Sequence, residues 1–186
     1  GIRVNYYASL GVIVPEPRLS FKYNFTNKFR IKGSAGKYSK NILSTTNDKD
    51  VVNYFIGFIS SPEETLYSFV KGKNINDKLQ KASHAVLGFE YDLNNRIEFN
   101  IETYYKNFEQ LAVINRNKRK NSDPNFVVET GKAYGIDFST KYETPKIYIW
   151  LTYSLGFVDR NDGEQIYPPV YDRRHNVNFM TNYNFG

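Results

Sequence analysis

Apolar and polar residues alternate along most of this chain with a period of two. The alternation is clearest over residues 19–25, 97–102, 136–139, 147–155 and 177–185. The spacing of an amphipathic helix, i, i+3 and i+4, accounts for none of these stretches. A period of two is typical of β-strands, whose successive side chains point to opposite faces. The pattern therefore predicts an all-β, antiparallel protein.

The alternation and the turn residues together predict about eight strands. They are expected at residues 1–9, 18–26, 29–41, 83–93, 96–112, 128–142, 146–158 and 174–185. Several of these exceed the five or six residues usual in soluble sheets. A tilted strand needs about 9–11 residues to cross a bilayer. The strand lengths therefore favour a transmembrane β-barrel.

The predicted connections alternate between short and long. Short turns are expected at 26–28, 93–95 and 143–145, and longer links at 10–17, 42–82, 113–127 and 159–173. Outer-membrane barrels have this asymmetry, with short periplasmic turns and long extracellular loops. The link 42–82 is too long for a bare loop. We expect it to carry an extra hairpin near 51–59 and a short helix starting at 61–64.

The alternation also assigns residues to two faces. We expect one set to face lipid, namely Phe21, Phe99, Ile136, Ile149, Leu151 and Phe179, and another to face the lumen, namely Lys22, Glu98, Asn100, Asp137 and Asn178. Aromatic residues cluster near strand ends, as in the interfacial girdles of barrels. A soluble barrel that binds a small apolar ligand would show the same pattern with its faces reversed. Glycines inside strands, such as Gly88 and Gly135, indicate bends or close packing.

Composition narrows the class of protein further. Aromatic residues make up 17% of the 186 residues, with 16 Tyr and 14 Phe. The mean hydropathy of −0.57 is compatible with a barrel, because lipid-facing and lumen-facing residues average out. The absence of Cys excludes a disulfide scaffold and thiolate metal sites. The net charge is +6, and its densest part, the basic run 116–120, is expected to be a solvated loop and not a nucleic-acid site.

Motifs for catalysis are missing from the sequence. We find no nucleotide-binding loop, metal-ligand spacing or nucleophile motif, so no enzyme, catalytic residue, metal or cofactor is expected. His84 and His175 lie far apart and are expected to be structural or interfacial. Glu98 and Glu102 share a strand face and could serve as an acid–base pair, but solvated lumen carboxylates are the simpler interpretation.

The most distinctive residues precede the last predicted strand. Tyr167 and a proline pair lead into Tyr171, Asp172, Arg173, Arg174 and His175. We call these five residues the loop-to-strand cluster. Arginine side chains at the start of a strand near the membrane surface can reach headgroups, phosphates or loop carboxylates. We expect the cluster to stabilise the barrel and not to recognise ligand.

These residues belong to a series of motifs that resembles the C-terminal part of TonB-dependent outer-membrane receptors, of the type with a carboxypeptidase-regulatory-like domain. The series comprises 131–137 (Gly-Lys-Ala-Tyr-Gly-Ile-Asp), 150–155 (Trp-Leu-Thr-Tyr-Ser-Leu), Tyr167-Pro168 and the loop-to-strand cluster, preceded by 16–20, 82–91 and 102–106. Two departures are Asp137, where the family usually has Glu, and the ending Phe185-Gly186 in place of a terminal aromatic residue.

The resemblance implies a function in uptake. It implies that residues 1–186 are part of a barrel of about 22 strands in the bacterial outer membrane, without the plug domain. Such a transporter imports a scarce ligand, such as a metal chelate, oligosaccharide or peptide. Its implied partners are the bilayer and lipopolysaccharide, its own plug domain, a TonB-type energising complex and the barrel assembly machinery.

Two other functions remain open at this point. The chain could be a complete eight-stranded barrel that acts as an anchor or adhesin, or a soluble β-barrel that binds a lipophile. The three possibilities differ in how the sheet closes. If the chain is part of a larger barrel, the strands at 1–9 and 174–185 should not pair with each other.

Overall fold

The computed structural model describes residues 1–44, 57–60 and 65–185, and these form strands, turns and irregular segments. No helix in this part of the chain is long and apolar enough to span a membrane. The prediction of an all-β, antiparallel protein is confirmed, except for a single parallel bridge between Val127 and Tyr67.

Eight longer strands account for most of the described chain. They are β1 (Ile2–Tyr7), β2 (Val12–Asn24), β3 (Phe29–Lys40), β8 (Gln80–Asn94), β9 (Ile97–Ile114), β10 (Phe126–Glu143), β11 (Ile147–Asn161) and β13 (His175–Tyr183). The other five strands are short: β4 (Ile42–Ser44), β5 (Phe58–Ser60), β6 (Leu66–Ser68), β7 (Lys73–Ile75) and β12 (Ile166–Tyr167). Of these, only β5 overlaps an expected element, the hairpin near 51–59. All eight predicted strands are therefore present.

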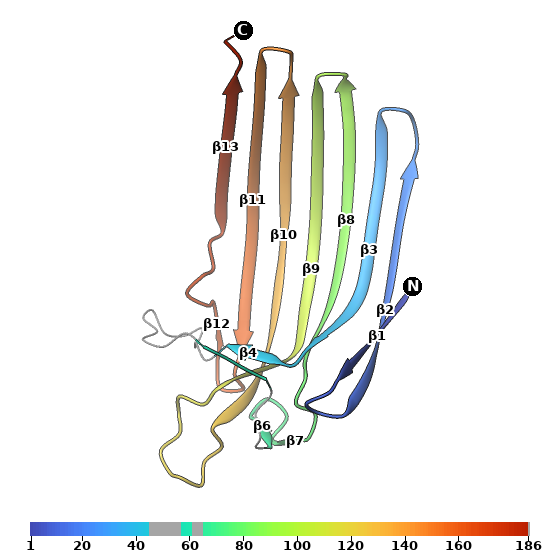
Figure 1. Ribbon diagram of the computed structural model, residues 1–186. Helices are drawn as coiled ribbons and strands as arrows, with labels where there is room; N and C mark the ends of the chain where they lie inside the picture. The colour runs from blue at the N-terminus through green and yellow to red at the C-terminus, as the bar shows by residue number, and fades with distance from the viewer. Residues whose placement is uncertain (45–56, 61–64, 186) are drawn as a thin grey trace.

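The long strands lie side by side in a single layer (Figure 1). Their order is β1-β2-β3-β8-β9-β10-β11, and β13 pairs with β11. In the described part of the chain, β1 pairs only with β2 and β13 only with β11. The prediction that the first and last strands do not pair is confirmed, and this sheet is open.

The tight turns after β2, β8 and β10 lie at one end of the sheet, and the longer links lie at the other end with the turn between β1 and β2 (Figure 1). The expected long link at 10–17 is wrong, because β2 already begins at Val12 and a tight turn with Gly11 at φ 61° precedes it. Short and long connections therefore do not alternate throughout the chain. Pro15 and Pro17, which fall in this expected link, lie within β2 opposite Val4 and Ile2.

These prolines lie where β2 passes from pairing with β1 to pairing with β3. Gly1 and Arg18 exchange both backbone hydrogen bonds across β1 and β2, at 2.8 Å each. By the alternation of an antiparallel ladder, the missing N–H groups of Pro15 and Pro17 would point toward β3. Glu16 compensates, since its carboxylate accepts hydrogen bonds from the backbone N–H (2.7 Å) and the hydroxyl (2.8 Å) of Ser39.

The strand register sorts the side chains into two faces. Residues of the apolar face lie opposite one another in rows, such as Phe99–Thr140–Leu151–Phe179 and Phe21–Gly33–Leu87–Thr103–Ile136–Leu155. The polar face carries Lys22, Arg30, Lys32, Glu90, Asp92, Glu98, Asn100, Glu102, Asp137 and Asn178. The predicted division into two sets is confirmed, although Trp150 and Met180 also lie on the polar face.

In the middle of β8, β9 and β10, the apolar face is the more exposed of the two. In β9, Ile101, Thr103 and Tyr105 are exposed while Glu102 and Tyr104 between them are half-buried. β8 follows the same rule, with Leu87 exposed and Gly88 buried. A water-soluble sheet has the opposite arrangement, with its apolar side chains covered.

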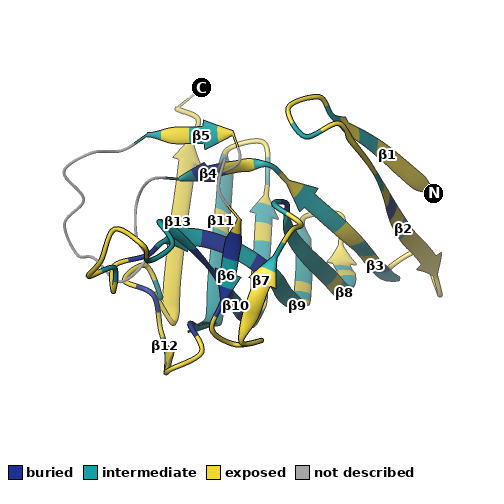
Figure 2. Ribbon diagram, turned by 90° about the horizontal axis from the view of Figure 1, so that it is seen from below, coloured by how far each residue is buried: buried dark blue, intermediate teal, exposed yellow. Residues whose placement is uncertain are grey.

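The described residues form a conventional hydrophobic core only at the end of the sheet that carries the long links. Leu43, Leu66, Ala112 and Val128 form it, and Ile59, Ile75 and Phe126 pack against it. Figure 2 shows the buried residues gathered near β4, β6 and β10. The link 42–82 thus forms the pairs β4–β5 and β6–β7. Of the expected hairpin only 57–59 is described; 51–56 and the helix start at 61–64 lie outside the described residues.

Replacement of Leu66, which is 0% exposed, tests this core. We expect Leu66→Ala to destabilise the packed end by about 2–5 kcal/mol, because it leaves a cavity, while the long strands keep their hydrogen bonds. Hydrogen exchange should show faster exchange in β6, β7 and the end of β10 only. Val70→Ala, at a 39% exposed position nearby, is the matched control. Equal loss of protection in β11 and β13 would contradict this separation.

Candidate functional site

A network of ion pairs crosses four strands of the polar face. Arg30 donates to both oxygens of Asp92 at 2.7 and 2.8 Å and to Glu90 at 2.9 Å. Lys22 lies 3.1 Å and Lys32 3.0 Å from the Glu90 carboxylate. Arg30 forms a bidentate contact with Asp92, and Glu90 has three cationic partners. The network therefore fixes side chains of β2, β3 and β8 relative to one another.

The network continues to β9 through Lys32, which also pairs with Glu102. Gly88 lies between these two residues in the same row. A Cβ atom at position 88 would lie 2.7 Å from Lys32 Cε and 3.2 Å from Glu102 Cγ. Because Gly88 has no side chain, Lys32 and Glu102 can approach each other above it. The glycine was expected to indicate close packing, and here the side chains of the polar face pack over it.

The two glutamates considered as an acid–base pair have separate partners. Glu102 accepts hydrogen bonds from Asn100 (3.2 Å) and Lys32, whereas Glu98 pairs with Lys141 at 3.4 Å. Glu98 also lines a polar hollow of about 290 Å³ beside Arg30 and Asp92. The structure thus offers a charged surface at this point, with carboxylates paired to cations of neighbouring strands.

Cationic and aromatic side chains form a second row on the polar face, closer to the long links. Arg18 Cζ lies 4.4 Å from the centroid of Tyr38, and Tyr38 stacks on His84 at 4.5 Å between centroids. His84 meets Phe108 edge-on at 6.4 Å, and Arg160 Cζ lies 5.4 Å from the Phe108 centroid. This row, which links β2, β3, β8, β9 and β11, was not predicted, because its members show no motif in the sequence.

The loop-to-strand cluster lies against β11, and β13 begins at its last residue. The Tyr171 hydroxyl accepts a hydrogen bond from Arg160 at 2.8 Å. His175 Nδ1 lies 2.9 Å from the Tyr153 hydroxyl, and the backbone carbonyl of Arg174 accepts a bond of 3.0 Å from Gly156. The cluster therefore fastens the incoming loop to the neighbouring strand.

The arginines of the cluster are exposed. The Arg174 side chain is 61% exposed, its Cζ lies 5.4 Å from the Phe157 centroid, and its Nε lies 3.7 Å from Asp172. Asp172 is much less accessible, with 9% of its side chain exposed. The positive charge of Arg174 is thus presented at the surface, beside an aromatic residue of the apolar face.

The basic run 116–120 lies in the loop between β9 and β10. Asp123 accepts hydrogen bonds of 2.9 Å from the backbone N–H groups of both Arg119 and Lys120. These two hydrogen bonds, of which that from Lys120 has the larger effect, hold the pKa of Asp123 below its usual 3.8. Lys118 reaches Asn125 at 2.6 Å, so that the run folds back onto its own loop.

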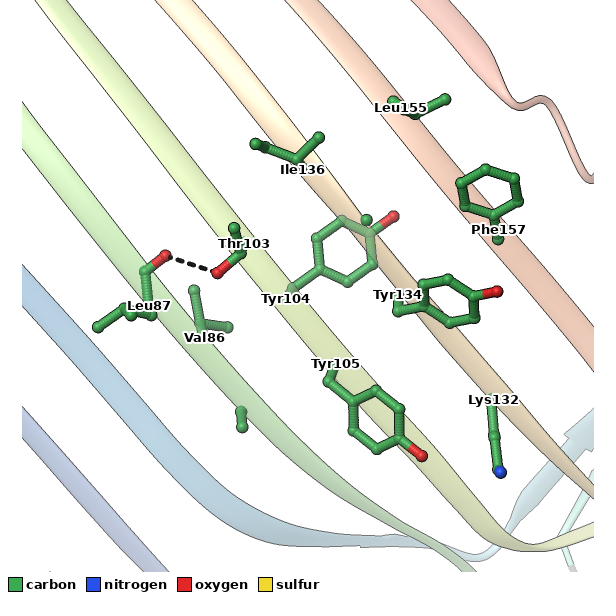
Figure 3. A pocket seen from close by; sticks show the side chains of 12 residues that line it. Val86, Leu87, Thr103, Tyr104, Tyr105, Lys132, Tyr134, Ile136, Leu155 and Phe157 are labelled. Atoms are coloured by element: carbon green, nitrogen blue, oxygen red, sulfur yellow. Dashed lines mark hydrogen bonds between the residues drawn. The ribbon is translucent and has the colours of Figure 1, made fainter.

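The apolar face is hollowed near its edge on the side of the long links. The hollow has a volume of about 690 Å³ and lies where Thr103 and Ala85 leave space between larger side chains. Figure 3 shows Leu87, Ile136 and Leu155 toward one end and Tyr105, Tyr134 and Lys132 toward the other. Thr103 donates its hydroxyl to the carbonyl of Leu87 at 3.3 Å, which satisfies its polar atom.

No group of three or more His, Asp or Glu residues within 1–44, 57–60 and 65–185 is arranged to hold a metal ion. The chain matches no family model, no curated protein and no solved structure. A functional assignment therefore depends on the fold and on the side-chain geometry.

Substitution of Gly88 tests whether the Lys32–Glu102 ion pair needs the space above this glycine. We expect Gly88→Leu to lower the free energy of unfolding by about 1–3 kcal/mol, because the new side chain displaces Lys32. Urea unfolding measures the change, and Ala85→Leu on the apolar face is the control. In a Lys32→Met background the cost of Gly88→Leu should shrink. An unchanged cost in that background would show that the ion pair is not involved.

Proposed function

We propose that this chain is part of the β-barrel of a TonB-dependent type of outer-membrane transporter, with its apolar face toward lipid and its polar face toward the lumen. One observation carries the proposal: in the middle of β8, β9 and β10, the apolar side chains occupy the more exposed face of a single-layer sheet. In water this face would remain uncovered at a large free-energy cost, whereas hydrocarbon would solvate it.

The dimensions of the apolar face support the proposal. The outward positions of β11 run from Ile147 to Phe157. At about 3.4 Å per residue they span about 34 Å along the strand, or about 26 Å across a bilayer if the strand is tilted by about 40°. The apolar band of outer-membrane barrels is about 25 Å tall. Aromatic residues such as Tyr105 and Tyr134 at one edge and Tyr142 and Tyr183 at the other correspond to the two girdles.

The two ends of the sheet support an orientation. Outer-membrane barrels have short periplasmic turns and longer extracellular loops. In this orientation the turns after β2, β8 and β10 are periplasmic, and the packed end with β4 to β7 is extracellular. The loop-to-strand cluster then lies on the extracellular side, at the membrane surface.

Active uptake is the part of the proposal that depends on the sequence resemblance. The motifs at 131–137, 150–155 and 171–175 follow one another in the order typical of TonB-dependent receptors. The ion pairs of the polar face would line the lumen, where a plug domain can move against a rigid, hydrated surface. A TonB-type complex of the inner membrane would supply the energy, and the ligand would first meet the extracellular loops.

The alternatives have weaker support. A complete eight-stranded barrel requires hydrogen bonds between β1 and β13, which pair only with β2 and β11 in the described structure. A soluble lipophile-binding barrel requires the apolar face to enclose a cavity, but its side chains are the exposed ones.

Arginine substitutions along β11 test which face meets lipid. Leu151 lies near the middle of the apolar face and Thr152, the next residue, on the polar face. We expect Leu151→Arg to cost about 2–4 kcal/mol of folding free energy in lipid vesicles. The cost should fall for Ile149→Arg and again for Ile147→Arg, which lie closer to the interface. Thr152→Arg is the matched control. Similar costs for Leu151→Arg and Thr152→Arg would refute the assignment of faces.

A second prediction concerns the role of Arg174. If the loop-to-strand cluster stabilises the barrel, Arg174→Ala lowers the yield of assembled receptor in outer membranes and leaves the ligand affinity of the folded fraction unchanged. The physical reason is the loss of its contacts with Phe157 and Asp172. Quantitative blotting of membranes and uptake per folded receptor measure the two effects. Normal assembly combined with a large loss of ligand binding would make the cluster a recognition site.

A further inference from the structure

Strands β2 and β3 separate in the half of the sheet nearest the long links. Their backbone pairing ends at Arg18 and Gly36, although residues 12–17 of β2 still pair with β1 and residues 37–40 of β3 still pair with β8. Beyond this point the β1–β2 hairpin and β3 diverge (Figure 1, Figure 2). We call the boundary between residues 12–17 and residues 37–40 the seam.

Side chains bridge the seam where the backbone ladder is missing. By the alternation of an antiparallel ladder, the N–H of Ser39 would bond to the backbone of β2, but it donates to the Glu16 carboxylate at 2.7 Å. The Ser39 hydroxyl donates to the same carboxylate and lies 2.8 Å from the Tyr7 hydroxyl. Pro15 and Pro17 have no N–H with which to continue the ladder. Opening of the seam would therefore break side-chain contacts but no ladder pairing.

Arg18 and Tyr38 cover the base of the seam on the polar face. Arg18 Cζ lies 4.4 Å from the centroid of Tyr38, and a Cβ atom at Gly36 would lie 3.0 Å from Arg18 Cγ and 3.4 Å from Tyr38 Cε2. Tyr38 in turn stacks on His84. Arg18 Nε and His84 Nε2 are buried and have no hydrogen-bond partner in the part of the chain that the structure describes. Aromatic rings and unsatisfied nitrogen atoms therefore lie together beside the seam.

The apolar face is hollowed at the base of the seam. This hollow has a volume of about 480 Å³, and Leu19, Ala35 and Ala85 contribute to its lining. Beyond it, the outward side chains of the β1–β2 hairpin remain apolar and exposed, namely Ile2, Val4, Tyr6 and Ile13. On the other side of the seam, the outward positions of β3 carry Lys37 and Ser39. An apolar surface thus borders a polar one, an arrangement that suits an amphiphile.

We propose that the barrel wall opens at the seam, and that carboxylates with an apolar chain pass through it between the lumen and the outer leaflet. The inference rests on the proposed function, which puts the polar face in the lumen and this end of the sheet on the extracellular side. The chain would lie in the hollow beside Leu19 and Ala35. The carboxylate would accept a charge-assisted hydrogen bond from Arg18, whose Nη2 already binds Glu16 at 2.7 Å and whose Nε has no partner among the described residues.

Pulsed electron paramagnetic resonance on the complete protein tests whether the seam opens. Spin labels at Val14→Cys and Lys40→Cys lie on opposite sides of the seam, and residues 1–186 contain no Cys that would interfere. We expect two distance populations, of which the wider should become the larger in Glu16→Ala, because this change removes the acceptor of both Ser39 hydrogen bonds. Labels at Lys40 and Gln80, which pair across β3 and β8, are the control and should give one narrow distance.

Cross-linking tests passage, with palmitate as the probe. The cells make the complete protein and lack other fatty-acid importers. Joining Val14→Cys to Lys40→Cys with a short reducible cross-linker should lower palmitate uptake about tenfold, and reduction should restore it. The same treatment of Lys40→Cys and Gln80→Cys should leave uptake unchanged, because that ladder is already paired. Methyl palmitate, which lacks the acidic head, should enter no faster than in cells without the protein.

Three results would overturn the proposal: a single distance across the seam that Glu16→Ala leaves unchanged, palmitate uptake that cross-linking does not affect, or equal uptake of palmitate and methyl palmitate. Membrane fractionation of the same cells separates this proposal from the proposed function. A protein in the outer membrane whose seam stays closed refutes only the lateral opening, whereas a protein outside that membrane refutes the proposed function.

Discussion

The long strands form one layer without a second layer packed over them, and the rest of the structure depends on this constraint. Stability must come from continuous hydrogen bonding between strands, because the described residues place no core beneath most of the sheet. β10, for example, pairs with β9 from Phe126 to Tyr142 and with β11 from Thr130 to Glu143. Unpaired backbone groups would cost several kcal/mol each in hydrocarbon, so such long ladders suit a bilayer.

Each face then meets its own physical requirement. The polar face places charges close together without a covering layer, and pairing across strands makes this tolerable. Glu90 is held by cations from two strands, and Gly88 leaves the space through which Lys32 reaches Glu102. The apolar face has no such pairing. Its side chains depend on the surrounding medium, and this is why the proposed environment follows from the exposed fraction of these residues and not from a motif.

The sequence predicted the long strands well because stretches with a period of two fall in most of them. It failed at 10–17, because Pro15 and Pro17 lie within β2 at positions where the missing N–H has no partner to lose. It indicated an extra hairpin near 51–59, which overlaps β5, but it showed no sign of β4, β6 and β7, because the core of Leu43 and Leu66 forms between segments far apart in the chain. The row from Arg18 to Arg160 was missed for the same reason: cross-strand register, which brings Tyr38 beside His84, cannot be read from local spacing.

The described chain therefore contains two kinds of folded structure, which differ in how their apolar side chains are covered. At the end with the long links, Leu66 and Val128 are buried in an ordinary hydrophobic core. In the sheet, Leu87 and Ile136 remain exposed, and in the proposed setting lipid would cover them. The change occurs within a few residues, at the cross-strand row Lys37–Ser83–Asn107–Lys132. Long cationic side chains suit such a boundary, because their apolar stems extend along hydrocarbon while their charged ends reach water and phosphate. The position of these lysines thus follows from the same physical division that separates the open sheet from the packed end.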